Sequence, residues 1–374
     1  MAKNYLAMLG KYEDTVSGQY HPHEFVARTA SPSLNFTFGN GHGLPLGYTL
    51  ALGGFPKGGK TLLCNMFTAQ IHRDYPDGIV LRFDTERRTE LQMSPEDGQR
   101  IWGIDPARHF VYATNNPMKI FDRIEKDFAA YCQDGVPIKA IVIDSVTSIK
   151  GRRAMNADTI ETQQIGDDAK TLGDGFKRIL DVVRDNHIAM ILTCQVRAEM
   201  DPREQMRGNK VKMSLPYSVQ HLAEYFMFVE RNQNKEGKTD LTGQEFRDTE
   251  LGDMNENGKG EQFAHKIRAT MKDSSAGPKG RVAEFTLDYQ KGLINAWEEA
   301  FRLGVNRGVI ERPNLQTYVF GDKKWKGKDD AWEAVREDQK LQQAIVDELF
   351  KRDKAGRIVS TKEDEENTEE ILGK

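Results

Sequence analysis

The chain has 374 residues, of which 38% are hydrophobic and 29% charged, and its formal net charge is -4. This composition predicts one main folded domain and excludes a chain that is disordered throughout. Because the chain as a whole is not basic, any nucleic-acid site would have to be a local cluster of cations.

Residues 1–34 predict a short helix and an extended arm, with a plain linker as the alternative reading of the arm. The main domain is expected over residues 35–294, where short apolar runs alternate with amphipathic stretches. Its first expected elements are strands over 48–52, 79–83 and 140–143, and helices over 60–73 and 118–131. Such alternation is typical of an α/β fold with a central, mostly parallel sheet and helices on its faces.

The pattern continues through the second half of the main domain. The expected elements there are a helix over 170–186 and strands over 188–194, 225–230, 266–271 and 282–287. A stretch rich in Gly, Asn and Lys after residue 232 predicts an exposed insertion. Residues 295–360, which begin with a helix over 295–303, predict a small C-terminal unit. Residues 361–374 hold an acidic run that predicts a disordered tail, which either solubilises the chain or binds a partner.

The three cysteines, Cys64, Cys132 and Cys194, lie far apart in apolar surroundings. That pattern favours reduced core thiols without zinc, in a reducing compartment. No segment has the sustained apolar run that a signal peptide or a membrane span needs. We therefore expect a cytoplasmic protein that does not contact a membrane.

The strongest motif is GFPKGGKT at residues 54–61, which fits G-x-x-x-x-G-K-[ST] between an expected strand and an expected helix. In such a loop, backbone N–H groups and the helix N-terminus hold phosphates, Lys60 reaches the β- and γ-phosphates, and Thr61 offers its hydroxyl to Mg²⁺. The expected cofactors are ATP and Mg²⁺, with a plain glycine-rich turn as the alternative. The residues expected at the nucleotide are Gly54, Phe55, Pro56, Lys57, Gly58, Gly59, Lys60, Thr61 and Leu62.

Three polar side chains follow apolar strands and are expected at the same edge of the sheet. Asp144 can hold a Mg²⁺-bound water, and it is followed by Ser145 where many ATPases have a glutamate. Glu86 is therefore assigned as the general base that orients the attacking water, alongside catalytic Lys60. Gln195 is expected to sense the γ-phosphate. The alternatives are that Asp144 only starts a turn, that Glu86 is a solvated charge and that Gln195 is a plain loop residue.

Two polar loops, over about 150–168 and 196–217, are expected to leave the sheet at that edge. Cations with scattered apolar side chains suit contacts to the phosphates and bases of single-stranded DNA, with an ordinary solvated loop as the alternative. The candidate DNA-binding residues are Arg152, Arg153, Gly166, Arg197, Arg203, Met206, Arg207, Lys210 and Lys212.

Together these motifs resemble those of RecA-family recombinases, specifically the UvsX-type recombinases of T-even and related phages. The resemblance spans about residues 25–293 and also includes Gly103-Ile-Asp-Pro106 and Ile165-Gly-Asp167. It implies a RecA-like P-loop ATPase core with Glu86 as the ATPase base, Gln195 as the nucleotide sensor and the two loops as the single-strand site. It also implies an N-terminal arm that docks on the neighbouring subunit of a helical filament.

The resemblance implies a DNA-dependent ATPase that pairs single-stranded DNA with a homologous duplex in recombination, repair and replication. Single-strand-binding and mediator proteins would be its partners, in the host cytoplasm if a phage encodes it. The family's two lysines that reach the neighbouring subunit's γ-phosphate are only partly matched. Lys272 corresponds to one, but Ser274 stands at the second position. Arg268, Lys279 or Arg281 could replace that second lysine.

Two other classes of protein share such a core. A ring-forming, hexameric replicative DNA helicase normally carries a separate N-terminal helical domain, for which about 40 residues before the first core strand are too few. A regulatory or scaffold ATPase that binds no DNA would lack the mixture of cations and apolar residues in the two loops. The resemblance therefore favours the recombinase over both.

Overall fold

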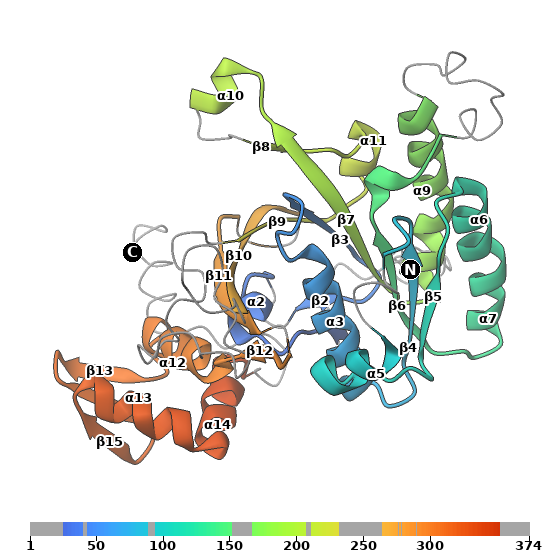
Figure 1. Cartoon of the computed structure of the whole chain (residues 1–374). Coiled ribbons are helices and arrows are strands. Elements are labelled where there is room, and N and C mark those ends of the chain that lie inside the picture. Colours follow the sequence, from blue (N-terminus) through green and yellow to red (C-terminus); the bar gives the residue numbers. More distant parts are fainter. Residues whose placement is uncertain are drawn as a thin grey trace, which may run out of the picture.

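A computed structural model of the chain describes residues 25–39, 43–88, 94–151, 167–206, 211–231, 264–275, 277, 279–288 and 290–351. These residues form a mixed α/β body around a large central sheet, with a smaller unit at the C-terminal end (Figure 1). As far as the chain is described, the large sheet has ten strands in the order β12-β11-β10-β9-β3-β7-β6-β4-β5, with β8 paired to β7.

Most of this sheet is parallel. The parallel strands are β3 (Thr49–Gly54), β4 (Ile79–Asp84), β5 (His109–Tyr112), β6 (Ile138–Asp144), β7 (Ala189–Ala198) and β9 (Tyr225–Arg231). Antiparallel pairing adds β8 (Val211–Met213), β10 (Ala264–Ser274), β11 (Val282–Asp288) and β12 (Gly292–Ile294). Central strands such as β6 are apolar on both faces because helices cover both.

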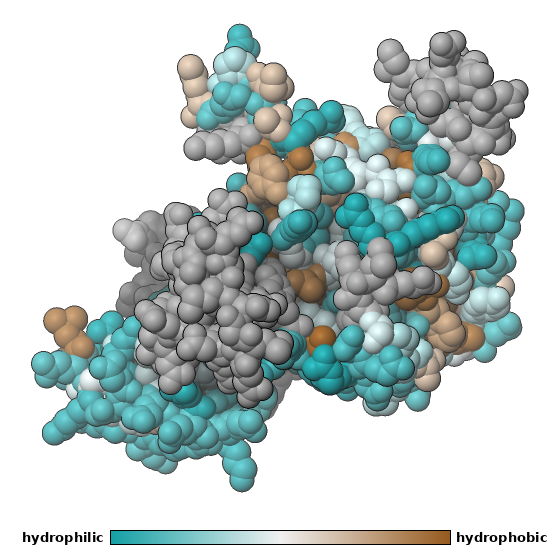
Figure 2. All heavy atoms as spheres, in the orientation of Figure 1, coloured by the Kyte–Doolittle hydropathy of each residue, from teal (hydrophilic) through white to brown (hydrophobic). Residues whose placement is uncertain are grey.

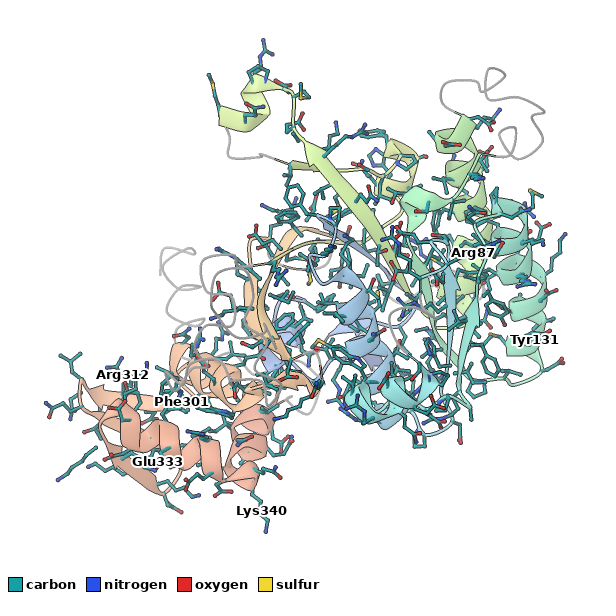
Figure 3. All side chains as sticks on the ribbon, viewed as in Figure 1. Arg87, Tyr131, Phe301, Arg312, Glu333 and Lys340 are labelled. Atoms are coloured by element: carbon teal, nitrogen blue, oxygen red, sulfur yellow. The ribbon has the colours of Figure 1, made fainter. Side chains whose placement is uncertain are left out.

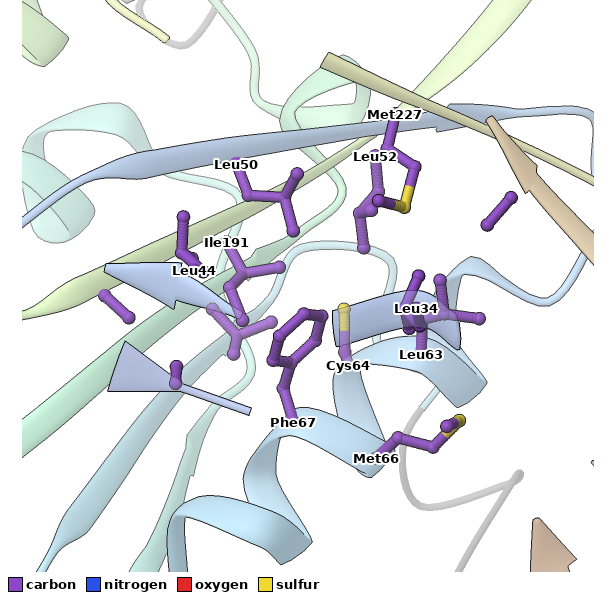
Figure 4. Packing of buried hydrophobic residues seen from close by; sticks show 14 of the residues in the cluster. Leu34, Leu44, Leu50, Leu52, Leu63, Cys64, Met66, Phe67, Ile191 and Met227 are labelled. Carbon is purple, nitrogen blue, oxygen red and sulfur yellow. The ribbon is translucent and has the colours of Figure 1, made fainter. Parts of the chain in front are cut away.

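Helices pack on the two faces of the sheet. One face carries α3 (Lys60–Asp74), α2 (Pro32–Phe36), α5 (Pro95–Asp97) and the π-helix η1 (Gly98–Trp102). The other carries α6 (Pro117–Asp122), the π-helix η2 (Arg123–Phe128), α7 (Ala129–Gln133) and α9 (Asp167–Asp185). Leu50 and Leu52 of β3 face α3, where they lie near Phe67 and Ile191 (Figure 4), whereas Ala51 faces the opposite core. The expected layering of an α/β fold is confirmed.

The segment Gly103-Ile-Asp-Pro106 connects the edge of the sheet to α3 through hydrogen bonds. The backbone N–H of Asp105 donates to His72 Nδ1 at 3.0 Å, and the Asp105 carboxylate accepts from Arg108 Nε at 2.8 Å. Arg108 also donates to the carbonyl oxygens of Tyr75 and Gly78. These contacts fix the start of β5, so this segment is structural.

The expected elements of the main domain are present, with shifted ends. The expected helix over 118–131 is a continuous run of α6, η2 and α7 whose middle is π-helical. The helix after the first loop starts at Asp167 instead of residue 170. The strand expected over 188–194 continues to Ala198, because β8 pairs with its extension. The short edge strand β5 was not predicted, since its residues are half-exposed and show no clear period.

The segment before the first core strand packs against the main body. β1 (Val26–Ala27) pairs with β2 (Leu44–Pro45), and Leu34 and Phe38 lie in the main core. The expected boundary at residue 34 therefore falls inside α2. Most of the expected arm, residues 1–24, lies outside the described residues, as does the expected insertion over 232–263.

The C-terminal unit has a core of its own, in which Phe301 lies (Figure 3), together with Tyr318 and Ile345. Its helices are α12 (Ala296–Asn306), α13 (Lys328–Glu337) and α14 (Gln339–Leu349). Its antiparallel strands are β13 (Glu311–Asn314), β14 (Thr317–Phe320) and β15 (Lys323–Lys326). The expected end of this unit and the acidic tail, 352–374, lie outside the described residues.

Candidate phosphate site and cationic ribbon

The carboxyl ends of four neighbouring strands meet at one edge of the sheet. Gly54 at the end of β3 pairs with Gln195 of β7, and Asp84 at the end of β4 pairs with Asp144 of β6. β6 and β7 are themselves parallel neighbours, with Ile143 opposite Leu192, so Gln195 lies two residues beyond the level of Asp144 but at the same edge. Arg87, just past β4, is labelled in Figure 3. The structure therefore brings these strand ends together, at the edge where ligands gather in parallel sheets.

The turn between β3 and α3 has a shape that requires glycine. Gly59 has φ 96° and precedes the first residue of α3, in a conformation that disfavours side chains. A methyl group on Gly54 would lie 2.3 Å from the carbonyl oxygen of Val229 in β9. Lys57 also has a positive φ, of 60°. The turn consequently leaves the first N–H groups of α3 accessible to a ligand instead of to a capping side chain.

Lys60 lies across the inside of this turn. Its ammonium group donates to the carbonyl oxygens of Gly54 and Phe55, both at 2.8 Å. Burial lowers the pKa of Lys60, and the negative charges of Asp144 and Glu86 partly offset that effect. A helix N-terminus with a cation held beside it fits the phosphate groups of a nucleotide.

The other residues of the turn differ in their exposure. Gly58 is buried and its N–H donates to the Phe55 carbonyl at 3.1 Å. Phe55, Pro56 and Lys57 are exposed on the outside of the turn, and Leu62 packs against the main core. The exposed three can therefore offer side chains to a ligand, whereas the side chain of Leu62 is partly taken up by the core.

Asp144 is held by three donors at the tip of β6. Its Oδ2 accepts from Thr61 Oγ1 at 2.9 Å and from Arg82 Nη2 at 2.5 Å, and its Oδ1 accepts from Thr193 Oγ1 at 2.6 Å. Burial acts to raise the pKa of Asp144, but the Arg82 charge and the hydrogen bonds outweigh it, so the pKa is lowered. An ionised carboxylate beside a threonine hydroxyl supplies the oxygen ligands, direct or through water, that Mg²⁺ prefers.

Within the described part of the chain, no group of three or more His, Cys, Asp or Glu side chains could hold a metal ion by itself. Thr61 and Asp144 could therefore hold Mg²⁺ only together with water or with the oxygens of a bound phosphate chain. This is how Mg²⁺ is usually bound where the substrate carries phosphates. The residues present thus fit the expected cofactor pair of a nucleotide and Mg²⁺.

Glu86 is fixed next to Asp144 by hydroxyl groups from the segment after β6. Its Oε1 accepts from Ser145 Oγ at 2.9 Å and from Ser148 Oγ at 3.2 Å, and its Oε2 lies 3.0 Å from Arg88 Nη1. Ser145, at the position where many ATPases have a glutamate, thus positions a glutamate from the neighbouring strand. A carboxylate anchored in this way can orient a water molecule toward a reacting group.

Two site residues were missed from the sequence. Arg82, inside the apolar run of β4, contacts Asp144 and also donates from Nη1 to Asn65 Oδ1 at 2.8 Å. Thr193 is a buried hydroxyl in the apolar run of β7. A single charged residue inside an apolar strand needs a buried partner, and this pattern could have indicated Arg82 as a site residue. A threonine in a strand is too common to have pointed to Thr193.

The second expected loop, over about 196–217, contains paired strands and short helices. β7 continues past Gln195 and pairs with β8, with Val196 opposite Met213, Arg197 opposite Lys212 and Ala198 opposite Val211. The paired strands form a ribbon, made of residues 195–206 and 211–214 in the described part of the chain, that projects from the main body and carries α10 (Pro202–Met206) toward its far end (Figure 1). The backbone N–H of Ser214 donates to the Gln195 carbonyl at 2.8 Å and closes its root.

The two faces of this ribbon differ. Because side chains alternate along a strand, Arg197 and Lys212 project on one face, whereas Val196, Val211 and Met213 project on the other. Arg197 and Lys212 are both exposed. The ribbon therefore has a cationic face and an apolar face.

The described candidate DNA-binding residues all lie on this ribbon. Arg203 is exposed on α10, and Met206 at the end of α10 is 89% exposed. α11 (Tyr217–Gln220) follows the ribbon. The candidates outside the described residues are Arg152, Arg153, Gly166, Arg207 and Lys210.

The apolar face of the ribbon packs on β3 just before the turn. A methyl group on Gly53 would lie 2.7 Å from both Cγ and Cε of Met213, so the Met213 side chain rests on the Gly53 backbone. Val196 and Met213 also line a hollow of about 430 Å³ beside β9 and α11. Figure 2 shows apolar side chains gathered where the ribbon meets the body. The ribbon thus contacts the residue that precedes the candidate phosphate turn.

Lys272 lies on β10, near the same edge. Its ammonium group is 5.8 Å from the centre of the Phe228 ring, which in turn meets Phe55 of the turn edge-on at 6.2 Å. The possible replacements for the second lysine make contacts within the chain. Lys279 lies 2.6 Å from Asp273, Arg268 lies 3.9 Å from Glu230, and Arg281 donates to the Phe36 carbonyl at 2.7 Å.

Comparison with known proteins adds no family assignment, because no family model and no curated protein matches the chain. In the described part of the chain, none of the helices combines the length and the apolar character that crossing a membrane would take.

Proposed function

We propose that the chain is an ATP-dependent DNA recombinase of the RecA type, which assembles on single-stranded DNA and pairs it with a homologous duplex. Support for a RecA-like P-loop core comes from the mostly parallel sheet and from the GKT turn between β3 and α3. Further support is the row of strand ends that brings Asp144 and Glu86 beside Lys60. ATP and Mg²⁺ are the proposed cofactors.

The observation that carries the proposal is the pair of cations on the ribbon. Arg197 and Lys212 lie directly opposite each other, and like charges in that position destabilise an antiparallel pair. A polyanion on that face removes the penalty, and the phosphates of a DNA strand supply one. The exposed Met206 at the far end of the ribbon is suited to contact unpaired bases.

The same ribbon starts at the candidate nucleotide site. Gln195 pairs with Gly54 in the sheet, and its carbonyl oxygen holds the ribbon root through Ser214. Met213 rests on Gly53. In the proposed mechanism, movement of the turn on nucleotide binding is passed through these contacts to the cationic face, and DNA binding is passed back to the turn.

Each residue at the turn has a proposed role in hydrolysis. Lys60 exchanges its two carbonyl partners for the phosphate oxygens and neutralises their charge. Thr61 and Asp144 would hold Mg²⁺, which would supply stabilisation of charge on the phosphates. Glu86, fixed by Ser145 and Ser148, orients the attacking water and accepts its proton.

We also propose how the chain assembles, which proteins it works with and where in the cell it acts. The chain would form a helical homo-oligomer through its N-terminal arm, with Lys272 facing a neighbouring subunit's nucleotide. It would act with single-strand-binding and mediator proteins, in the cytoplasm of a cell or of a phage-infected host.

A strand-exchange assay tests this function. The purified chain, ATP and Mg²⁺ are mixed with a labelled single strand and either a homologous or an unrelated duplex. We expect joint molecules with the homologous duplex alone and only in the presence of ATP. Joint molecules that form without homology would contradict the recombinase function. Unwinding of a forked duplex without any pairing would favour the replicative helicase instead.

A further inference from the structure

Arg82 is among the largest side chains that are fully buried in the described part of the chain. It is 2% exposed and stands between the apolar Leu81 and Phe83 in β4. Burying a guanidinium group is costly unless an opposite charge and hydrogen bonds compensate. The cost implies that the position of this cation matters beyond filling space, because an apolar side chain would fill the same space without it.

The partners of Arg82 belong to the candidate nucleotide site. Nη2 lies 2.5 Å from Asp144 Oδ2, the same oxygen that accepts from Thr61 Oγ1 at 2.9 Å. Nη1 donates to Asn65 Oδ1 at 2.8 Å, one helical turn after Thr61 on α3. Arg82 thus lies behind the carboxylate, on the α3 side of the sheet.

The charges around the turn consequently leave a net positive charge without a metal ion. Asp144 places one negative charge close to where phosphates would bind, and that charge would repel them. Arg82 neutralises it from within the protein, and Arg88 is likewise paired with Glu86. Lys60 therefore leaves one net positive charge among these five residues.

We propose that Arg82 is a positioning residue that substitutes for the divalent cation when none is bound, so that nucleotide phosphates can bind before Mg²⁺ does. The proposal rests on the nucleotide site proposed above. Arg82 acts through Asp144 and does not touch the ligand. It lowers the dependence of nucleotide binding on Mg²⁺, because it screens Asp144 from the phosphates and competes with Mg²⁺ for the carboxylate.

Equilibrium binding of a fluorescent ADP analogue tests this role without any turnover. The dissociation constant is measured in EDTA and in Mg²⁺. The readout is the ratio of the constant in EDTA to the constant in Mg²⁺. In Arg82→Met the exposed charge of Asp144 should weaken binding in EDTA and strengthen it in Mg²⁺, which raises the ratio at least about tenfold. A merely structural role would change both constants by the same factor and leave the ratio unchanged, which would overturn the proposal.

Two further variants make the comparison specific. Arg82→Lys keeps the cation but cannot span both Asn65 and Asp144, and its ratio should stay near that of the parent. Arg184→Met is the matched control, because it removes the arginine of another partly buried pair, 2.8 Å from Glu224, whose carboxylate also accepts from Thr49 N at the opposite end of β3. Its ratio should equal that of the parent.

If Arg82→Met does not fold, Arg82→Gln keeps a donor for Asp144 without the charge and should show the same raised ratio. A ratio equal to that of Arg82→Lys would contradict the proposal. If the parent chain does not bind the ADP analogue in Mg²⁺, the proposed nucleotide site itself is wrong. This outcome differs from an unchanged ratio, which contradicts only the role of Arg82.

Discussion

Glu86 illustrates how single residues at the strand ends share one task. Its carboxylate does not follow the metal-side aspartate in sequence, but Ser145 and Ser148 hydroxyl groups bring it to the same tip of the sheet. The side chain is only 20% exposed and so is held in one orientation. Position and charge can therefore be tested separately at this residue.

The substitution Glu86→Gln keeps an oxygen that accepts the two serine hydroxyls but removes the charge that accepts a proton. We expect nucleotide binding to be retained and ATP hydrolysis to fall by about 10²- to 10⁴-fold, the usual range for loss of a general base. Glu333→Gln, at an exposed position of the C-terminal unit, is the control. Hydrolysis by Glu86→Gln at the rate of the parent would exclude Glu86 as the base.

At this scale the sequence predicted the motif residues but not their partners. Lys60, Thr61 and Asp144 could be found because each stands at a defined place relative to an apolar strand or a glycine turn. Arg82 and Thr193 reach Asp144 only through the pairing of β6 with β4 and β7, and β4 is a neighbour of β6 in the sheet although β5 lies between them along the chain. Contacts set by crossover order leave no local pattern in a single sequence.

Among the elements, the ribbon and the phosphate turn are joined through a residue without a side chain. The Gly53→Ala substitution places a methyl group 2.7 Å from Met213 Cγ, so the ribbon root must shift. We expect a loss of about 1–3 kcal/mol in the free energy of unfolding, typical of overpacking, and weaker binding of single-stranded DNA. Denaturant unfolding and fluorescence anisotropy measure the two effects.

The double variant Gly53→Ala with Met213→Ala provides the control, because it removes the side chain that the new methyl group meets. DNA affinity should recover toward that of the parent. If Gly53→Ala alone bound DNA as tightly as the parent, the contact between ribbon and turn would have no part in DNA binding.

The order of elements was largely predictable, and the ribbon was not. The strands of the parallel sheet are apolar on both faces, which gives them a strong signal even without a period of two. β8 is only three residues long, so its alternation of apolar and cationic side chains is too short to indicate a strand. Its pairing follows from the extension of β7, which a polar sequence after Gln195 does not indicate.

For the whole molecule, one buried carboxyl group takes part in the junction between the main body and the C-terminal unit. Glu299 of α12 accepts from the hydroxyl groups of Ser31, the N-cap of α2, and Ser33 within α2. Burial raises the pKa of Glu299 to about 7, against the lowering effect of those hydrogen bonds and of Arg302. The C-terminal unit is thus fastened to the segment that leads out of the N-terminal region.

A raised pKa in the folded state means that the folded chain binds the proton more tightly than the unfolded chain does. The stabilisation is complete below the ordinary pKa of 4.5 and is lost as the pH rises through about 7. We expect the melting temperature to fall over that range and Glu299→Gln to flatten the profile. Glu333→Gln should keep the profile of the parent. An unaltered slope in Glu299→Gln would show that another group controls the stability.

We propose above all that the nucleotide turn and the DNA-binding ribbon are coupled. The rate of ATP hydrolysis with and without single-stranded DNA tests this coupling most directly. The account predicts that single-stranded DNA accelerates hydrolysis by the parent chain severalfold. It also predicts no hydrolysis by Lys60→Ala, and little acceleration in a variant with Arg197→Ala and Lys212→Ala. The same rate with and without DNA, or undiminished hydrolysis by Lys60→Ala, would contradict it.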